Sequence, residues 1–201
     1  MDAVRSAAIM PPAAPLTYGT FCLRYRRASD LDAICAASHD PETRRWLDDP
    51  PMDAEARAAS MARVAEAWRT GRSAPLVIAD SVTDQPVGLI NVQFRDDDVA
   101  TIAYSVFPGR RGQGVAPRAV RLAVDWAFSD LGVSELLLEI DPGNLASVRV
   151  ARKCGFEPAA RVVSRAQDEP GRRDKLVFAT RKDQTGAADL LTWLRLARCP
   201  C

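Results

Sequence analysis

A glycine-rich, basic turn between an apolar run and a helical pattern constrains this chain more than any other feature. The apolar run covers residues 104–108, the turn covers residues 110–116, and apolar side chains then recur at helical spacing up to position 128. Two glycines in the turn let the backbone curl until successive N–H groups converge, and the first turn of a helix adds unpaired N–H donors at the positive end of its dipole. The segment therefore predicts a strand, a phosphate-binding turn and a helix, with a pyrophosphate as the expected ligand.

The composition is that of one ordinary globular domain. The chain has 201 residues, and its 27 basic and 26 acidic side chains leave a net charge of +1. A net charge this small gives no electrostatic reason to expect a nucleic acid or a membrane surface as a partner. One histidine and five scattered cysteines form no metal-binding pattern and fit reduced thiols in the cytoplasm. The sequence contains no run of about eighteen apolar residues, so it predicts no membrane-spanning helix. We expect a cytoplasmic protein without a metal.

Apolar periodicity and turn residues divide the chain into short strands and helices. Strands are expected at residues 20–26, 76–79, 87–92, 99–107, 136–140, 161–163 and 176–179, and helices at residues 30–38, 58–68, 115–128 and 145–154. The strands before and after the 115–128 helix must be parallel, because a helix connects them. We expect a flexible arm over residues 1–16, one domain over residues 17–183, and an amphipathic tail over residues 184–201.

A second motif follows the glycine-rich turn by about thirty residues and makes the pattern specific. It consists of Asn-x-x-Ser at residues 144–147 and Lys-x-Gly-Phe at residues 153–156. Together with Arg-x-x-Gly-x-Ala at residues 111–116, it resembles the GNAT superfamily of acyl-CoA-dependent N-acetyltransferases over roughly residues 20–180. The second motif is most similar to the Rim-type branch, which includes N-terminal acetyltransferases of ribosomal proteins and many small-amine acetyltransferases.

The resemblance implies a fold and a pair of substrates. The fold is the GNAT fold of the α/β (α+β) class: a mixed, mostly antiparallel sheet of six to seven strands, splayed at its parallel pair, with helices on both faces. The implied acyl donor is acetyl-CoA and the implied acceptor is an amine, bound by a monomer or a homodimer. Neither a nucleic acid nor a membrane is an expected partner.

The resemblance assigns the CoA pyrophosphate to the glycine-rich turn. Backbone N–H groups would hold the phosphates, and arginine forks suit phosphate oxygens. The pantetheine arm would pair like an extra strand along residues 104–106, and a backbone N–H at or near Val106 would face the acetyl carbonyl. The residues expected to bind the cofactor are Val106, Arg110, Arg111, Gly112, Gln113, Gly114, Val115, Ala116, Asn144 and Ser147.

Ser147 is the expected general acid. The resemblance implies that Asn144 reaches the pantetheine amide and that Ser147 approaches the thioester sulfur, where a hydroxyl can protonate the departing thiolate. Many relatives have a tyrosine seven residues after the asparagine, but this chain has Ala151 there. Asn144 is equally suited to capping the helix that follows it.

The proton acceptor for the amine is less defined. Many relatives have a glutamate in the fourth strand of their sheet, and the matching position here is Thr101. Glu139 and Asp141 alternate onto one face of the next strand and are the nearest carboxylates in sequence, so Glu139 is the expected catalytic carboxylate. Both could also be exposed charges at the end of the strand. His39 is a further candidate, with a pKa suited to proton transfer, although a lone histidine in a loop is more often a surface residue.

The resemblance implies transfer of an acetyl group from acetyl-CoA to a primary amine, by direct attack in a ternary complex without a covalent enzyme intermediate. No convincing nucleophile is present, since Cys154 lies beside a helix end and is expected to be buried. The charged segment at residues 39–49 is a plausible rim for a cationic or peptide acceptor. Two alternatives stay open: a CoA-binding regulatory protein without catalysis, and transfer of another acyl group such as succinyl.

Overall fold

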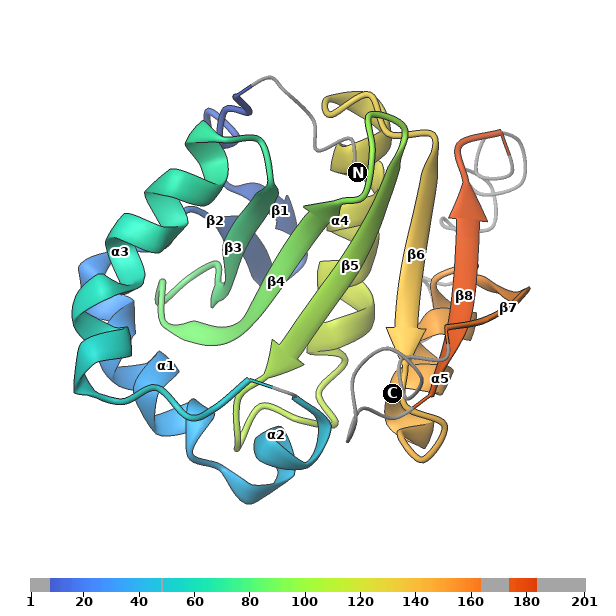
Figure 1. Cartoon of the computed structure of the whole chain (residues 1–201). Helices are drawn as coiled ribbons and strands as arrows, with labels where there is room; N and C mark the ends of the chain where they lie inside the picture. Colours follow the sequence, from blue (N-terminus) through green and yellow to red (C-terminus); the bar gives the residue numbers. More distant parts are fainter. Residues whose placement is uncertain (1–7, 48, 164–173, 184–201) are drawn as a thin grey trace.

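The computed structural model describes residues 8–47, 49–163 and 174–183, and it has one mixed eight-stranded sheet at its centre (Figure 1). The strand order is β1-β2-β3-β4-β5-β6-β8-β7. The strands are β1 (Leu16–Tyr18), β2 (Phe21–Arg24), β3 (Ser73–Asp80), β4 (Pro86–Phe94), β5 (Val99–Val106), β6 (Glu135–Ile140), β7 (Glu157–Val163) and β8 (Lys175–Arg181). Only β5 and β6 pair in parallel; every other pairing between these strands is antiparallel.

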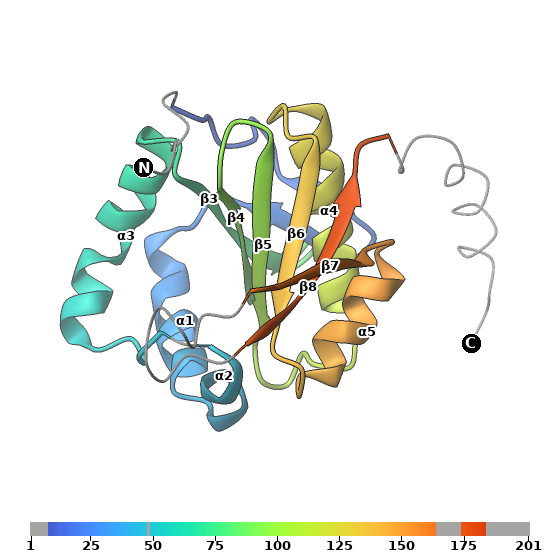
Figure 2. The same cartoon turned by 45° about the vertical axis from the view of Figure 1, so that its right-hand side comes forward.

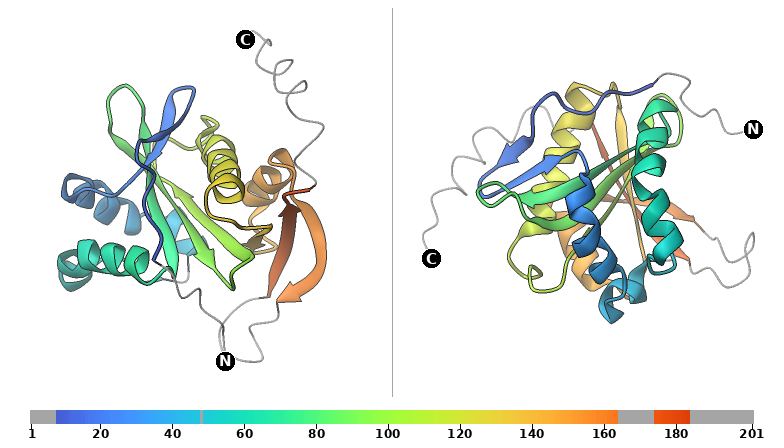
Figure 3. Two further views of the ribbon diagram at one scale, coloured as in Figure 1. Left: turned by 90° about the horizontal axis from the view of Figure 1, so that it is seen from above. Right: turned by 90° about the vertical axis from the view of Figure 1, so that its left-hand side faces the viewer.

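Helices cover both faces of the sheet (Figure 3). The helical segments are η1 (Ala28–Asp30), α1 (Leu31–Ser38), α2 (Pro41–Trp46), α3 (Ala54–Arg69), α4 (Val115–Ser129) and α5 (Leu145–Lys153). Helix α4 crosses β2, β4 and β5 on one face, while α1 and α3 contact β4 and β3 from the other side. Helix α5 lies against β6 at the far end of the sheet (Figure 2).

The apolar face of α4 is central to the core. Its residues Ala119, Ala123 and Ala127 are fully buried, and their small side chains let the helix lie close to the sheet. Ile90 and Leu136 on the strands beneath are almost fully buried in the same cluster. This packing fixes the start of α4, and with it the glycine-rich turn, at the end of β5.

The sheet splays where its parallel pair begins to separate. Register partners join β5 and β6 only from Val99 opposite Glu135 to Thr101 opposite Leu137. Beyond these three pairs β5 continues to Val106 and β6 to Ile140 without pairing to each other. The second half of β5 therefore has a sheet edge that faces away from β4, as the expected GNAT fold requires.

The described structure differs from the sequence expectations at its N-terminal end. The sheet has eight strands instead of six to seven, because Leu16–Tyr18 forms a hairpin strand with β2. Ile9 lies in the segment expected to be a flexible arm, yet its side chain is buried in the core and its N–H donates to the carbonyl of Trp68 at 3.1 Å. A one-residue apolar anchor of this kind leaves no periodic signal in the sequence.

A short helix, not predicted from the sequence, lies within the charged segment at residues 39–49 that was considered as a rim for an acceptor. Helix α2 begins after Asp40, whose side chain accepts a hydrogen bond from the Thr43 N–H at 2.8 Å, and Pro41 occupies its first turn. An Asp-Pro pair is a recognised start signal for a helix, so the sequence did contain the information. The amphipathic tail expected over residues 184–201 lies outside the described residues.

None of the helices in the described ranges is long and apolar enough to cross a membrane. Within the same ranges, no three His, Cys, Asp or Glu side chains gather where they could hold a metal ion.

Candidate active site

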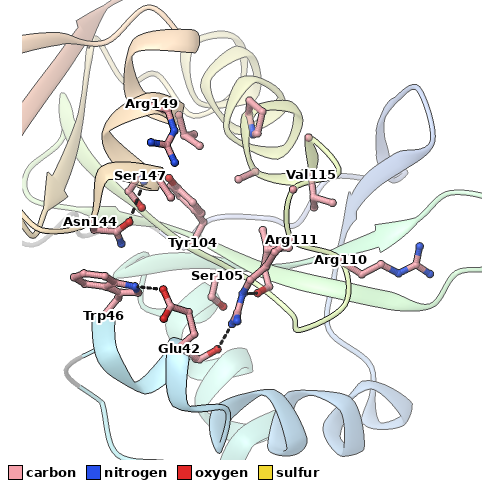
Figure 4. Close-up of a pocket in the computed structure, with 18 of the residues that line it drawn as sticks. Glu42, Trp46, Tyr104, Ser105, Arg110, Arg111, Val115, Asn144, Ser147 and Arg149 are labelled. Atoms are coloured by element: carbon pink, nitrogen blue, oxygen red, sulfur yellow. Dashed lines mark hydrogen bonds between the residues drawn. The ribbon is translucent and has the colours of Figure 1, made fainter. Parts of the chain in front are cut away.

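A cavity of about 380 Å³ opens where β5 and β6 part (Figure 4). Helix α2 contributes one wall, and the second half of β5 with the glycine-rich turn forms a second. The first turn of α4 and one side of α5, up to Lys153, complete the cavity. Residues 105 and 106, 110–112 and 114–116, and 144 and 147 all line it. The structure thus brings most of the residues predicted to bind the cofactor into one cavity.

The glycine-rich turn has the backbone shape that its glycines allow. Gly112 and Gly114 have φ angles of +76° and +73°, a region that side chains with a Cβ rarely adopt. Gly114 is the N-cap residue of α4, so the N–H groups of Val115 and Ala116 begin a helix and have no intrahelical acceptor. Pro117 follows at a helix position that tolerates a missing N–H. The turn and the helix start therefore offer backbone donors to an anion.

Two arginines of the turn are engaged within the protein. Arg111 donates from Nε to the carbonyl of Val106 at 3.1 Å, and from Nη2 to Asp40 at 2.7 Å and Thr43 at 2.8 Å. This contact with Arg111 lowers the pKa of the Asp40 carboxyl. Arg110 extends away from the Ser147 side of the cavity, and its Nη1 lies 4.0 Å from an Asp80 oxygen (Figure 4). Arg111, predicted to bind phosphate, here connects the end of β5 to the start of α2.

Two other cations face the cavity from α5. Arg149 and Lys153 line it and are exposed, and neither pairs with a carboxylate in the described part of the chain. They add positive charge on the α5 side, and sequence reasoning missed both as candidate phosphate contacts. Their spacing of four residues on one helix places them on the same face, which was the available signal.

The free edge of β5 presents backbone groups to the cavity. The Phe107 N–H donates to the carbonyl of Val87 on β4 at 2.9 Å. Because backbone groups alternate in direction along a strand, those of Val106 and Tyr104 point away from β4, toward the gap left by β6. The edge can therefore pair with an extended ligand, and the carbonyl of Val106 is already held by Arg111.

The second motif builds the opposite wall. The Asn144 side chain accepts a hydrogen bond from the Ser147 N–H at 3.0 Å and so caps α5. Of the two roles considered for Asn144, capping is the one that the structure contains. Both Asn144 and Ser147 line the cavity, and Figure 4 shows Ser147 beside the ring of Tyr104.

Tyr104 contributes a second hydroxyl that sequence reasoning did not consider. Its side chain points to the α4 and α5 face of the sheet, and its hydroxyl is buried without a hydrogen bond of good geometry among the described residues. Burial raises the pKa of the Tyr104 phenol to about 12, and the nearby Ser147 hydroxyl offsets part of this increase. The phenol is therefore protonated throughout the neutral pH range. Strand alternation alone could have placed it here, next to Val106 on the same face.

Comparison with known proteins decides the family. Residues 20–157 match the family described as "Acetyltransferase (GNAT) domain", which is more than half of the chain. The chain belongs to the GNAT acetyltransferase family.

Solved structures agree with this GNAT fold. Mycobacterium smegmatis RimJ in complex with CoA-disulfide superposes with a TM-score of 0.76 at 21% identity, covering 98% of this chain and 98% of RimJ. The ribosomal-protein-S5-alanine acetyltransferase of Vibrio fischeri superposes with a TM-score of 0.69 at 16% identity, covering 85% of this chain and 97% of that chain. The predicted resemblance to the GNAT fold, with Rim-type neighbours, is confirmed.

Curated relatives of this GNAT protein match over shorter stretches. The spermidine N(1)-acetyltransferase of Escherichia coli K12 is 37% identical over 51 residues, which is 25% of this chain and 27% of that protein. The aligned stretches span 40% or less of the curated relatives' own length.

Ala151 and Thr101 stand where many GNAT relatives have a tyrosine and a glutamate, and the structure gives both residues structural contacts. Ala151 is fully buried within α5. The Thr101 hydroxyl accepts a hydrogen bond from Arg95 Nε at 3.0 Å, and the same guanidinium binds Glu139 at 2.7 Å. Glu139 does not line the cavity, so the structure does not bring the predicted catalytic carboxylate to it.

The other residues considered for chemistry also lie away from the cavity lining. The His39 ring nitrogen Nδ1 lies 2.9 Å from the Cys35 carbonyl at the end of α1, and an Asp141 oxygen accepts the Gly143 N–H at 2.9 Å. Burial raises the pKa of the Cys154 thiol to about 11, which disfavours the thiolate and agrees with its expected packing role.

Proposed function

We propose that this protein transfers an acetyl group from acetyl-CoA to a primary amine, by direct attack while both substrates are bound. One observation carries the proposal: the pairing of β5 with β6 stops after three residue pairs, beside a cavity that joins the glycine-rich turn to Asn144 and Ser147. The residues present fit an acyl-CoA. The turn offers N–H donors for a pyrophosphate, and the free edge of β5 offers a partner for the amides of the pantetheine arm.

The roles follow from the walls of the cavity. We assign the pyrophosphate to the backbone of Gly112, Gln113, Gly114, Val115 and Ala116, all of which except Gln113 line the cavity. Arg149 and Lys153 supply positive charge from α5. The backbone N–H of Val106, which points away from β4, stabilises the oxyanion that forms at the acetyl carbonyl.

The transfer needs a proton at the sulfur. The amine nitrogen forms a bond to the acetyl carbon, the C–S bond breaks, and its electron pair leaves on sulfur. We assign protonation of this thiolate to the Ser147 hydroxyl, at the N-terminal end of α5, where the helix dipole also favours negative charge.

Acetyl-CoA should raise the melting temperature of the protein. A ligand that binds only the folded state at about one hundred times its Kd adds roughly 2.7 kcal/mol, which for a domain of this size corresponds to about 5–10 °C. Differential scanning fluorimetry with and without saturating acetyl-CoA measures the shift, and an unchanged melting temperature would remove the acyl-CoA proposal.

Ser147→Ala should spare acetyl-CoA binding and lower kcat by roughly 10²-fold, the size of a typical general-acid contribution. Release of free thiol across a panel of amines gives kcat, and the shift in melting temperature controls for binding. Tyr104→Phe in the same assay separates the two hydroxyls. A loss confined to the tyrosine variant would contradict the assignment to Ser147.

A CoA-binding regulatory protein without catalysis is the second candidate. Buried Ala151 and the engaged Thr101 favour it, because neither position offers the usual acid or base. Such a protein should show the acetyl-CoA shift in melting temperature, yet release no thiol above background with any amine.

A further inference from the structure

The wall of the cavity formed by α2 takes no part in the proposed binding of the acyl donor. Among the described residues that line the cavity, Glu42 is the only carboxylate, whereas arginine and lysine side chains line it from the glycine-rich turn and from α5. The cationic side suits the phosphates of an acyl donor. The opposite charge on the α2 side suits a cation.

Glu42 is oriented by an indole. Trp46 Nε1 donates to a Glu42 oxygen at 2.7 Å, one turn along the same helix (Figure 4). The far edge of the Trp46 ring packs beside Gly143, where an added Cβ would lie 3.5 Å from Cη2. The ring thus bridges α2 and the loop that precedes Asn144, which places its partner Glu42 at the α2 side of the Ser147 wall.

Both ends of α2 are held in place. Arg111 binds Asp40 and Thr43 at its start, and Trp46 contacts the loop before α5 at its end. Glu42 lies between these two contacts, so they fix its backbone, while the hydrogen bond from Trp46 orients its exposed side chain. A side chain that binds a substrate for reaction must be held in a fixed orientation by its surroundings, and the contacts of α2 provide this for Glu42.

The neighbouring charges are already engaged. Asp40 and Arg111 neutralise each other, and the Arg45 guanidinium lies 4.7 Å from the centre of the Trp46 ring. An Asp141 oxygen accepts the Gly143 N–H. Glu42 is the carboxylate on this side that lines the cavity.

We propose that Glu42, held by Trp46, binds the ammonium group of the acceptor and takes its proton before attack. This proposal rests on the acetyl-transfer function proposed above and names the residue that fills the role expected of Glu139. The ammonium nitrogen gives its first proton to Glu42, which returns it to solvent. The freed electron pair forms the C–N bond. A second proton leaves the nitrogen after attack, and one proton ends on the sulfur of CoA.

The test compares amines that differ in charge. Butylamine is cationic at pH 7.5, whereas 2,2,2-trifluoroethylamine is uncharged and needs no proton acceptor before attack. Glu42→Gln keeps an oxygen that can accept from Trp46 and removes the basic carboxylate. We expect kcat/KM for butylamine to fall by about 10²-fold, while kcat/KM for trifluoroethylamine falls by no more than about threefold.

The pH profile gives a second readout that a structural defect would not produce. The parent protein should use the cationic form of butylamine, so its kcat/KM should change little between pH 7 and 9. The Glu42→Gln variant depends on the free amine, so its kcat/KM should rise by about tenfold per pH unit below the amine pKa. Trp46→Phe, which keeps the ring and removes the N–H donor, should produce a smaller loss with the same preference for the uncharged amine.

Glu55→Gln is the matched control, since it removes the same charge from an exposed site in the first turn of α3. It should behave as the parent with both amines. Equal losses with both amines in Glu42→Gln, or no loss with butylamine, would overturn the role of Glu42. If the parent releases thiol with no amine of the panel, or if acetyl-CoA does not shift its melting temperature, the proposed function itself fails.

Discussion

Replacing Gly114 with valine should abolish the rise in melting temperature that acetyl-CoA produces. Gly114 has φ +73° and ψ 17° at the N-cap of α4, a left-handed conformation that costs a residue with a Cβ roughly 1–2 kcal/mol. The nearest atom to an added Cβ is Arg118 Nη1 at 3.2 Å, the end of a flexible side chain. The fold should therefore survive, while the turn relaxes and its N–H groups no longer converge.

Gly19→Val is the matched control for this prediction. Gly19 has a φ of +60° in the turn between β1 and β2, and nothing lies within 4 Å of an added Cβ. The substitution should cost a similar amount of stability and keep the full acetyl-CoA shift. Scanning fluorimetry on both variants decides the matter: a full shift in Gly114→Val would show that the turn does not hold the donor.

Asp30→Ala should destabilise the fold by roughly 3–5 kcal/mol, the cost of leaving a buried ion without its partner. Two Arg24 nitrogens donate to the two Asp30 oxygens at 2.8 Å each, and the Arg27 N–H donates to the same carboxylate at 2.8 Å. The side chains of Arg24 and Asp30 are 4% and 2% exposed. Asp84, which also binds Arg24, is half exposed and can compensate only in part. Urea unfolding gives the free energy.

The pH dependence of this loss has a definite sign. Burial alone would raise the pKa of Asp30, but the hydrogen bonds from Arg24 and from the Arg27 N–H lower it on balance. The stabilisation is therefore complete above the unfolded pKa of about 3.9 and is lost as the pH falls through the lower folded value.

The neighbouring Asp32→Ala supplies the control, because the side chain of Asp32 is 89% exposed and forms a surface pair with Arg57. It should cost less than about 1 kcal/mol. Equal losses in the two alanine variants would contradict the assignment to the buried pair.

The fold was largely predictable because its signals are local. The glycine-rich turn, the capped α5 and the helical crossover between β5 and β6 each leave a short motif in the sequence. Helix α2 was not predicted, although Asp40 and Pro41 are typical residues for the start of a helix. A helix of six residues is too short to show a clear apolar periodicity in the sequence. The hairpin strand β1 is defined by its pairing with β2, which sequence patterns of three residues do not reveal.

The candidate site was predictable on its donor side only. Backbone groups of the turn and the second motif follow from residue type and spacing. The hydrogen bond from Arg95 to Glu139 joins residues 44 positions apart, and the contact of Arg111 with Asp40 that holds α2 at the cavity joins residues 71 positions apart. Single-sequence patterns do not contain such contacts, so the choice among carboxylates required the three-dimensional structure.

The Arg111 side chain contacts two walls of the cavity, β5 and α2. Its Nε holds the last carbonyl of β5, and its Nη2 holds the first turn of α2. A donor and an acceptor that both change these contacts would alter each other's affinity by the same coupling free energy. We therefore expect an Arg111 substitution to change both dissociation constants and the energy that couples them.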